Sequence, residues 1–306
     1  MINELKAGMK TEIIVLLRLQ KIGNSSNGGV FARGLAEDNS GCLPFICFEA
    51  GIVERLRAFD APKAVRLNVH VDINKFSSDM ALQLVVQKMS EVTEQDDISH
   101  LLPQGNFDAQ LCETRFNDLV QKITHTELQQ LILKIFTGDV FKQFLINPAG
   151  MRLHHAYVGG LLEHSVSVTE LACVMADKIG HVNKDLIIAG ALLHDVGKLK
   201  EISPEMGFPY TTEGRLLGHI TLTAMLVKQV AEQMSFQDDK LLQELLHIVL
   251  SHHGDREKGS PIACATKESF IVHYADEIDA IMNQFAKDKD KDQWEYNKML
   301  QRYILF

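Results

Sequence analysis

The chain has 306 residues, of which 46% are hydrophobic and 23% charged, as in ordinary soluble proteins of one large or two average domains. Its longest apolar runs, 186–193 and 245–250, are too short to cross a membrane, and the first ten residues lack the features of a signal peptide. Five widely spaced cysteines without a CxxC pair argue against a disulfide framework or a cysteine-ligated zinc site. We therefore expect a cytoplasmic protein without membrane attachment.

Acidic charge is concentrated in the second part of the chain. Residues 1–95 carry 11 Lys and Arg against 11 Asp and Glu, so the formal net charge of −9 arises entirely from residues 96–306. This balance argues against binding duplex DNA along a long phosphate footprint. It suits a site that concentrates metal cations, which can then attract an anionic substrate.

The pattern of residues 8–93 is typical of β-strands separated by turn-forming residues. Strands are predicted over 11–22, 29–36, 41–48, 64–76 and 81–92, with a short helix over 52–59. Five strands with a helix before the fourth is the order of an OB-fold, a small barrel that binds nucleic acids or oligosaccharides. We predict an all-β OB-fold domain over residues 1–93. Within it, Phe31, Arg33 and Phe48 are candidate contacts to bases and phosphates, with core packing as the alternative for the rings.

Beyond a polar segment at 94–109, predicted to be a linker, the periodicity becomes helical. Helices are predicted near 111–124, 126–136, 138–146, 161–179, 184–197, 218–234, 238–252 and 267–286, with a last helix over 293–305. The predicted second domain, residues 110–306, is therefore all-α.

Ten of the thirteen histidines lie between residues 154 and 273. The segment ALLHDVGKLKE (191–201) predicts an apolar helix that ends in adjacent His194 and Asp195. Four further candidates lie on separate predicted helices, namely His164, His219, His252 and Asp276. Imidazoles and carboxylates without thiolates suit Mn, Fe, Co, Ni or Zn better than Mg or Ca. A carboxylate such as Asp195 can bridge two metal ions about 3.5–4 Å apart, as two-metal sites for phosphoryl transfer require.

The order H…HD…H…H…D, with HDVGK at 194–198, resembles the HD superfamily of metal-dependent phosphohydrolases. A narrower resemblance is carried by LHHAYVGGLLEHS (153–165), YTTEGRLLGHI (210–220), LSHHGDREKGSP (250–261) and VHYADEIDA (272–280). Together with the predicted barrel, these segments resemble the YhaM-type 3′-to-5′ exoribonucleases of bacteria. The resemblance covers nearly the whole chain.

The resemblance implies two metal ions that share one carboxylate. The first ion would be held by His164, His194, Asp195 and Asp276. The second would be held by Asp195, His219 and His252, with His253 as a further candidate.

Other residues would act on the substrate or on the ligands. Lys198 and, less favoured, His155 would contact the scissile or a neighbouring phosphate, as the resemblance implies. Asp279 lies one helical turn after Asp276, so we expect it to orient a metal ligand. His273, one turn before Asp276, is assigned to the same supporting role or to the core, with ligation as the less favoured alternative.

One segment departs from the family pattern. The third barrel strand reads Pro44-Phe45-Ile46-Cys47-Phe48-Glu49, which lacks the family's basic residue and has Phe where the family has Trp. This departure leaves fewer side chains for base stacking, which implies weaker binding of RNA.

We therefore predict an enzyme that hydrolyses single-stranded RNA from its 3′ end and releases nucleoside 5′-monophosphates. Two divalent ions are expected, with Mn favoured over Co, Fe, Ni or Zn. Single-stranded DNA as substrate and assembly into a homo-oligomer remain open. The alternatives are a phosphohydrolase of small nucleotides and a non-catalytic RNA-binding or regulatory module with a structural metal site.

Overall fold

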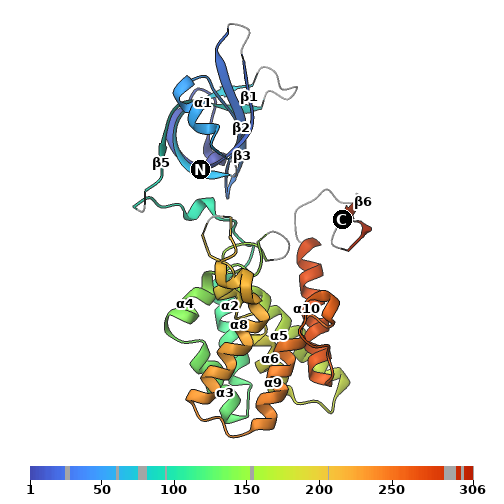
Figure 1. Cartoon of the computed structure of the whole chain (residues 1–306). Coiled ribbons are helices and arrows are strands. Elements are labelled where there is room, and N and C mark those ends of the chain that lie inside the picture. Colours follow the sequence, from blue (N-terminus) through green and yellow to red (C-terminus); the bar gives the residue numbers. More distant parts are fainter. Residues whose placement is uncertain are drawn as a thin grey trace. The chain divides into compact units, whose positions relative to one another are not determined.

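The chain forms two compact units, Met1–Gln104 and Gly105–Phe306, in the computed structural model. The structure describes residues 1–24, 28–59, 62–74, 81–93, 95–151, 155–205, 207–285, 294–297 and 300–305. The first unit is a β-barrel and the second is built mainly of helices (Figure 1). The predicted fold, an N-terminal five-stranded barrel followed by a helical domain, is thereby confirmed.

Five strands close the barrel in the order β1-β2-β3-β5-β4. They are β1 (Lys10–Asn24), β2 (Val30–Asp38), β3 (Gly41–Cys47), β4 (Lys63–Ile73) and β5 (Leu82–Glu91). The short helix α1 (Ala50–Leu56) lies between β3 and β4 in the chain, and β3 pairs with β5 in parallel. Alternate side chains of β4, from Val65 to Val71, are buried, as expected for a strand with one face in a barrel core.

The three predicted nucleic-acid contacts lie on the barrel strands or next to them. Phe48, just after β3, is 55% exposed, and Arg33 on β2 is also exposed. Phe31 is half-buried, with its ring packed over Gly23 so closely that a Cβ there would lie 2.9 Å from its Cζ atom. The neighbouring Phe45, by contrast, is fully buried in the barrel core.

Residues 95–104, within the segment predicted as a linker, belong to the barrel unit. The short 3₁₀ helix Ser99–Leu101 is held there because His100 Nε2 donates to the carbonyl oxygen of Ile14 at 2.9 Å. The backbone N–H of Asn39 also donates to the carbonyl of His100 at 2.8 Å.

The helical unit is arranged around α6, whose residues from Leu186 to Leu193 are all buried. A helix that is apolar on every side requires neighbours on every side. The other helices are α2 (Ala109–Gln121), α3 (Thr126–Ile135), α4 (Gly138–Ile146), α5 (Gly160–Ile179), α7 (Lys198–Glu201), α8 (Thr212–Gln233), α9 (Asp239–Ser251) and α10 (Lys267–Phe285), with α6 spanning Lys184–Leu193. Within the described residues, none of these helices has the length and apolar character needed to span a membrane.

Two helices differ from their predicted form in ways that shape the site. The predicted helix 184–197 ends at Leu193, and α7 begins only at Lys198, so His194 and Asp195 lie in the connecting turn. Helix α8 begins earlier than predicted and is kinked at Gly218, whose φ of 70° interrupts the helical geometry just before His219.

The predicted C-terminal helix over 293–305 is wrong. The described residues there form an antiparallel hairpin of β6 (Trp294–Asn297) and β7 (Arg302–Leu305). Aromatic and β-branched residues favour strands, and Tyr296 faces Tyr303 across the hairpin with ring centres 5.3 Å apart.

Candidate metal centre

Two helix ends, one helix kink and positions inside two further helices bring the predicted ligands together. His164 lies in the first turns of α5, and Asp276 lies in the middle of α10. His194 and His252 each follow the last residue of a helix, α6 and α9, and His219 follows the kink in α8.

Asp195 lies at the centre of this group and is almost fully buried. Its Oδ2 atom is 3.4 Å from His164 Nε2 and 3.3 Å from His194 Nε2. Its Oδ1 atom is 3.3 Å from His219 Nε2 and 3.7 Å from His252 Nε2. Each carboxylate oxygen therefore faces its own pair of imidazoles, the arrangement needed to bridge two metal ions.

Asp276 completes the first of these two groups. Its Oδ1 atom is 3.2 Å from His164 Nε2 and 3.9 Å from His194 Nε2. Potential ligand atoms of His164, His194 and Asp276 all lie within 4.8 Å of one another, and the same holds for His194, Asp195 and His252.

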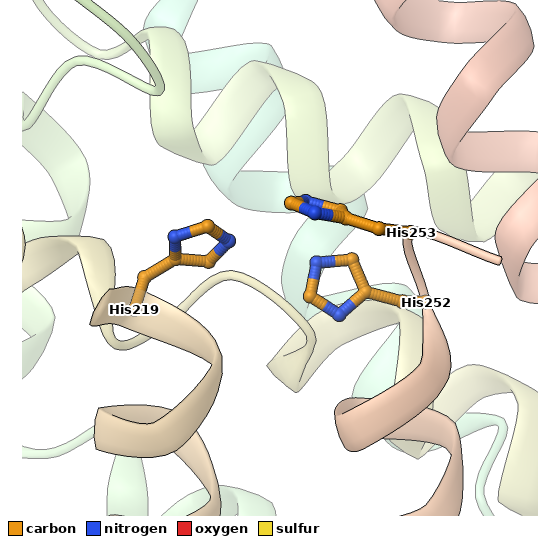
Figure 2. A group of neighbouring side chains, drawn as sticks. All are labelled: His219, His252 and His253. Carbon is orange, nitrogen blue, oxygen red and sulfur yellow. The ribbon is translucent and has the colours of Figure 1, made fainter. Parts of the chain in front are cut away.

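His253 joins the second group. Figure 2 shows the rings of His219, His252 and His253 turned toward one another, and their potential ligand atoms also lie within 4.8 Å of one another. The Nδ1 atom of His253 donates to the carbonyl oxygen of Lys258 at 3.2 Å, which directs its other ring nitrogen away from that loop.

Hydrogen bonds behind the rings fix their tautomers. His194 Nδ1 lies 2.7 Å from the carbonyl of Ala191, and His252 Nδ1 lies 2.7 Å from the carbonyl of Val249. Because a carbonyl can only accept, each Nδ1 donates this bond, and each ring is held with Nε2 facing the centre.

The same arrangement leaves buried acceptors that require a cation. In the described part of the chain, Asp195 Oδ1, His219 Nε2 and His252 Nε2 are buried without a hydrogen-bond partner, although they face one another. Buried polar atoms without partners are costly. Three converging acceptors fit a divalent cation, and nitrogen and carboxylate donors fit Mn, Fe, Co, Ni or Zn.

Electrostatics around the first group point the same way. Burial disfavours a charged His164 ring, but its hydrogen bonds to Asp195, Asp276 and Asp279 outweigh this and hold its pKa well above the ordinary value. Burial also opposes ionisation of Asp195, yet the nearby Lys198 ammonium and His194 ring hold the pKa of the carboxyl well below its ordinary range. The carboxylates around His164 are therefore stabilised by nearby positive charge. A divalent ion would provide that charge in place of the proton on His164.

The second group is different in character. Burial, together with the neighbouring rings of His194 and His253, lowers the pKa of His252 well below its ordinary value. This ring is therefore neutral, which is the form that binds metal.

Asp279, predicted to orient a ligand, lies directly behind His164. Its Oδ2 atom accepts from His164 Nδ1 at 2.7 Å and from His155 Nε2 at 2.8 Å. His155 is held further by Glu163 and by the Tyr157 hydroxyl, at 3.2 and 2.9 Å from its Nδ1 atom. His155 thus lies behind His164, among carboxylates, and is not part of the lining of the cavity at Asp195 and Lys198.

Glu201, which no sequence pattern indicated, holds His219 in the same way. Its carboxylate accepts the Nδ1 proton of His219 at 3.0 Å and the His219 backbone N–H at 3.0 Å. Burial opposes ionisation of Glu201, but these bonds from His219 lower the pKa of its carboxyl. The only signal was an acidic residue seven positions after His194, which no spacing rule singles out.

A cavity of about 700 Å³ opens onto the centre. Its polar wall includes Asp195, Lys198, His219, His253 and Asp276. The Lys198 ammonium lies 2.6 Å from Asp195 Oδ2. His273 also lines this cavity, and its Nδ1 donates to the carbonyl of His252 at 2.8 Å.

Comparison with solved structures gives partial matches. The mitochondrial single-stranded DNA binding protein Rim1 of S. cerevisiae matches with a TM-score of 0.21 and 11% identity, over 28% of this chain and 95% of its own. The HD domain of the L. monocytogenes phosphodiesterase PgpH matches with a TM-score of 0.31 and 21% identity, over 50% of this chain and 77% of its own.

Comparison with protein sequences gives matches that cover more of the chain. Residues 161–281 match the HD domain family, and this range holds every predicted metal ligand from His164 to Asp276. The 3′-5′ exoribonucleases YhaM of Listeria welshimeri and Listeria monocytogenes are each 30% identical over 291 residues, which cover 93% of this chain and 89% of theirs. An identity kept over nearly the full length of both chains means that this protein belongs to the YhaM family of 3′-5′ exoribonucleases.

Proposed function

We propose that this chain hydrolyses single-stranded RNA from the 3′ end with two divalent ions, of which Mn²⁺ is the first candidate. His164, His194, Asp195 and Asp276 would hold one ion, and Asp195, His219 and His252 the other, with His253 nearby. The observation that carries this proposal is Asp195, whose two oxygens face separate pairs of imidazoles. A single structural ion would not require that division of one carboxylate.

When bound, such ions would supply Lewis acidity to the phosphate and lower the pKa of water to near neutrality. The side chains of the protein have complementary tasks. Asp279 and Glu201 hold His164 and His219 in fixed orientations. Lys198 places an ammonium on the cavity wall, where it can offset negative charge on a phosphoryl oxygen.

Two observations favour an RNA strand as substrate. The Listeria relatives are named exoribonucleases, and their similarity extends over 93% of this chain, so it includes the barrel as well as the HD domain. The cavity volume of about 700 Å³ lies within the usual range for small ligands, so it can admit one terminal nucleotide.

The test uses one single-stranded RNA in three forms: labelled at the 5′ end, labelled at the 3′ end, and circular. With Mn²⁺, the 3′ label should appear at once as mononucleotide and the 5′ label as a ladder of shortening strands. The circle should persist. Chelation should stop the reaction and added Mn²⁺ should restore it.

Asp195→Asn provides the matched variant, because it keeps the shape of the side chain and removes its charge. It should lose both ions and at least about a hundredfold in rate, or roughly 2.7 kcal/mol of transition-state stabilisation. Asp239→Asn, an exposed position at the start of α9, serves as the control. Turnover of small nucleotides without shortening of linear RNA would refute the proposal.

A further inference from the structure

An exposed aromatic ring lines the cavity, and an arginine lies against that ring. Tyr210 is 41% exposed and lines the same cavity as Asp195 and Lys198. The guanidinium carbon of Arg215 lies 5.4 Å from the centre of the Tyr210 ring. Neither residue belongs to the metal centre described above.

Tyr210 is held in a defined place relative to that centre. Its backbone forms a β-bridge with Ile202, and the next residue, Thr211, donates its N–H to the carbonyl of Glu201 at 2.9 Å. Phe208, two residues before Tyr210, is only 2% exposed. Because Glu201 also holds His219, the exposed ring and a metal-ligating imidazole are tied to the same residue.

Arg215, next to Tyr210, differs from the two lysines that line the cavity. The Lys198 ammonium is 2.6 Å from Asp195, and the Lys258 ammonium is 2.6 Å from Glu277. For Arg215, which is exposed, no carboxylate within 4.0 Å is found in the described part of the chain. Its charge is therefore available to an anion from outside.

We propose that Tyr210 and Arg215 form a nucleotide subsite. The base of the nucleotide at the 3′ end stacks on Tyr210, and Arg215 pairs with a phosphate of the strand at the entrance. Stacking accepts every base because every base has a π face, which suits an enzyme that must remove each nucleotide in turn. This inference rests on the proposed function for its substrate class.

The decisive experiment measures binding rather than turnover. Adenosine 5′-monophosphate and ribose 5-phosphate are titrated calorimetrically into the full-length protein with Mn²⁺. They share the sugar phosphate and differ only in the base. The wild type should bind the adenosine compound more tightly, by about fivefold to a hundredfold, the range expected for stacking of one base.

Substitutions of Tyr210 then identify the ring as the source of that preference. Tyr210→Ala and Tyr210→Leu should remove it, Tyr210→Phe should keep it, and all three should bind ribose 5-phosphate as the wild type does. Metal content should stay unchanged. Tyr303→Ala, which removes another exposed tyrosine, on β7 and outside the cavity lining, is the control.

The role of Arg215 is tested by measuring how KM for RNA depends on salt concentration. On single-stranded RNA, Arg215→Ala should raise KM. It should also make KM less dependent on salt concentration, by the equivalent of about one phosphate contact, whereas Lys228→Ala on the same helix should do neither.

An unchanged preference for the adenosine compound in Tyr210→Ala, or loss of metal in that variant, would overturn the subsite. If the wild type prefers the adenosine compound but cleaves no RNA, the proposed function fails and the subsite stands.

Discussion

At the residue scale, two of the proposed metal ligands are oriented by the helices that precede them. His194 and His252 each follow the last residue of a helix, and each donates Nδ1–H to the carbonyl three residues earlier, Ala191 or Val249. The last carbonyls of a helix have no intrahelical partner, so these imidazoles satisfy one of them. The same bond directs Nε2 outward, so that a histidine at this position caps the helix and leaves one ring nitrogen for the proposed metal ion.

His219 follows a kink instead, and it depends on Glu201 for its orientation. Glu201→Ala should therefore lower the affinity for one of the two ions by about 10–100-fold, as is usual when a partner of a ligating histidine is removed. Metal titration followed by mass spectrometry would measure both ions separately. Glu213→Ala, an exposed acid nearby, should leave both affinities unchanged. Equal weakening of the two ions would argue against a specific link to His219.

A variant of Lys198 would separate the proposed contact of this lysine with phosphate from any role in metal binding. Lys198→Ala should keep two ions per chain and lower kcat by about tenfold to a hundredfold, or about 1.4–2.7 kcal/mol of transition-state stabilisation. The exposed Lys200, two residues away, provides the control variant Lys200→Ala. If the Lys198 variant loses metal instead, the lysine is structural and its proposed contact with phosphate must be withdrawn.

At the scale of elements, the turn between α6 and α7 is pressed against α8. A Cβ atom on Gly197 would lie 2.2 Å from the carbonyl oxygen of His219 and 2.7 Å from the backbone nitrogen of Thr223. The Gly197 N–H also donates to the Thr223 hydroxyl at 2.8 Å. Close approach of the two backbones is therefore what brings Asp195 within reach of His219.

Gly197→Ala should consequently separate α7 from α8. We expect a loss of about 1–3 kcal/mol in the free energy of unfolding, the usual cost of overpacking, together with weaker binding of the ion at His219. Urea denaturation with and without Mn²⁺ would measure both effects. Gly51→Ala is the control, since nothing lies within 4 Å of the added methyl group. A Gly197 variant as stable as the wild type would show that α8 can move away at no cost.

Periodic segments could be predicted from the sequence, but contacts that lack a period could not. The barrel strands and α5 were predicted because alternation and helical spacing recur over many residues, and the HD motif indicated the ligands. Glu201 was missed because α7 is a single turn, too short for a pattern. The predicted helix over 293–305 was wrong because the apolar residues of so short a segment fit a helical period as well as that of a strand.

At the scale of the whole molecule, the two units have separate cores. The barrel core extends from Ile2 to Met89, and the helical core extends from Cys112 to Ala275, with no residue in common. All proposed metal ligands lie in the helical unit, and the exposed Phe48 and Arg33 lie in the barrel unit. The two units can therefore be tested apart from each other.

A fragment of residues 105–306 should fold, bind two metal ions and hydrolyse a small diester such as bis(p-nitrophenyl) phosphate. It should degrade long single-stranded RNA much less well than the full chain, because each base no longer stacked on the barrel loses about 1–3 kcal/mol of binding free energy.

Circular dichroism must first establish that the fragment is helical and unfolds cooperatively. In the full chain, Phe48→Ala combined with Arg33→Ala should reproduce part of the loss by raising KM at unchanged kcat. If the folded fragment degrades long RNA as efficiently as the full chain, the barrel does not deliver the substrate. A role for the barrel in assembly or regulation would then be the better explanation of why the chain carries it.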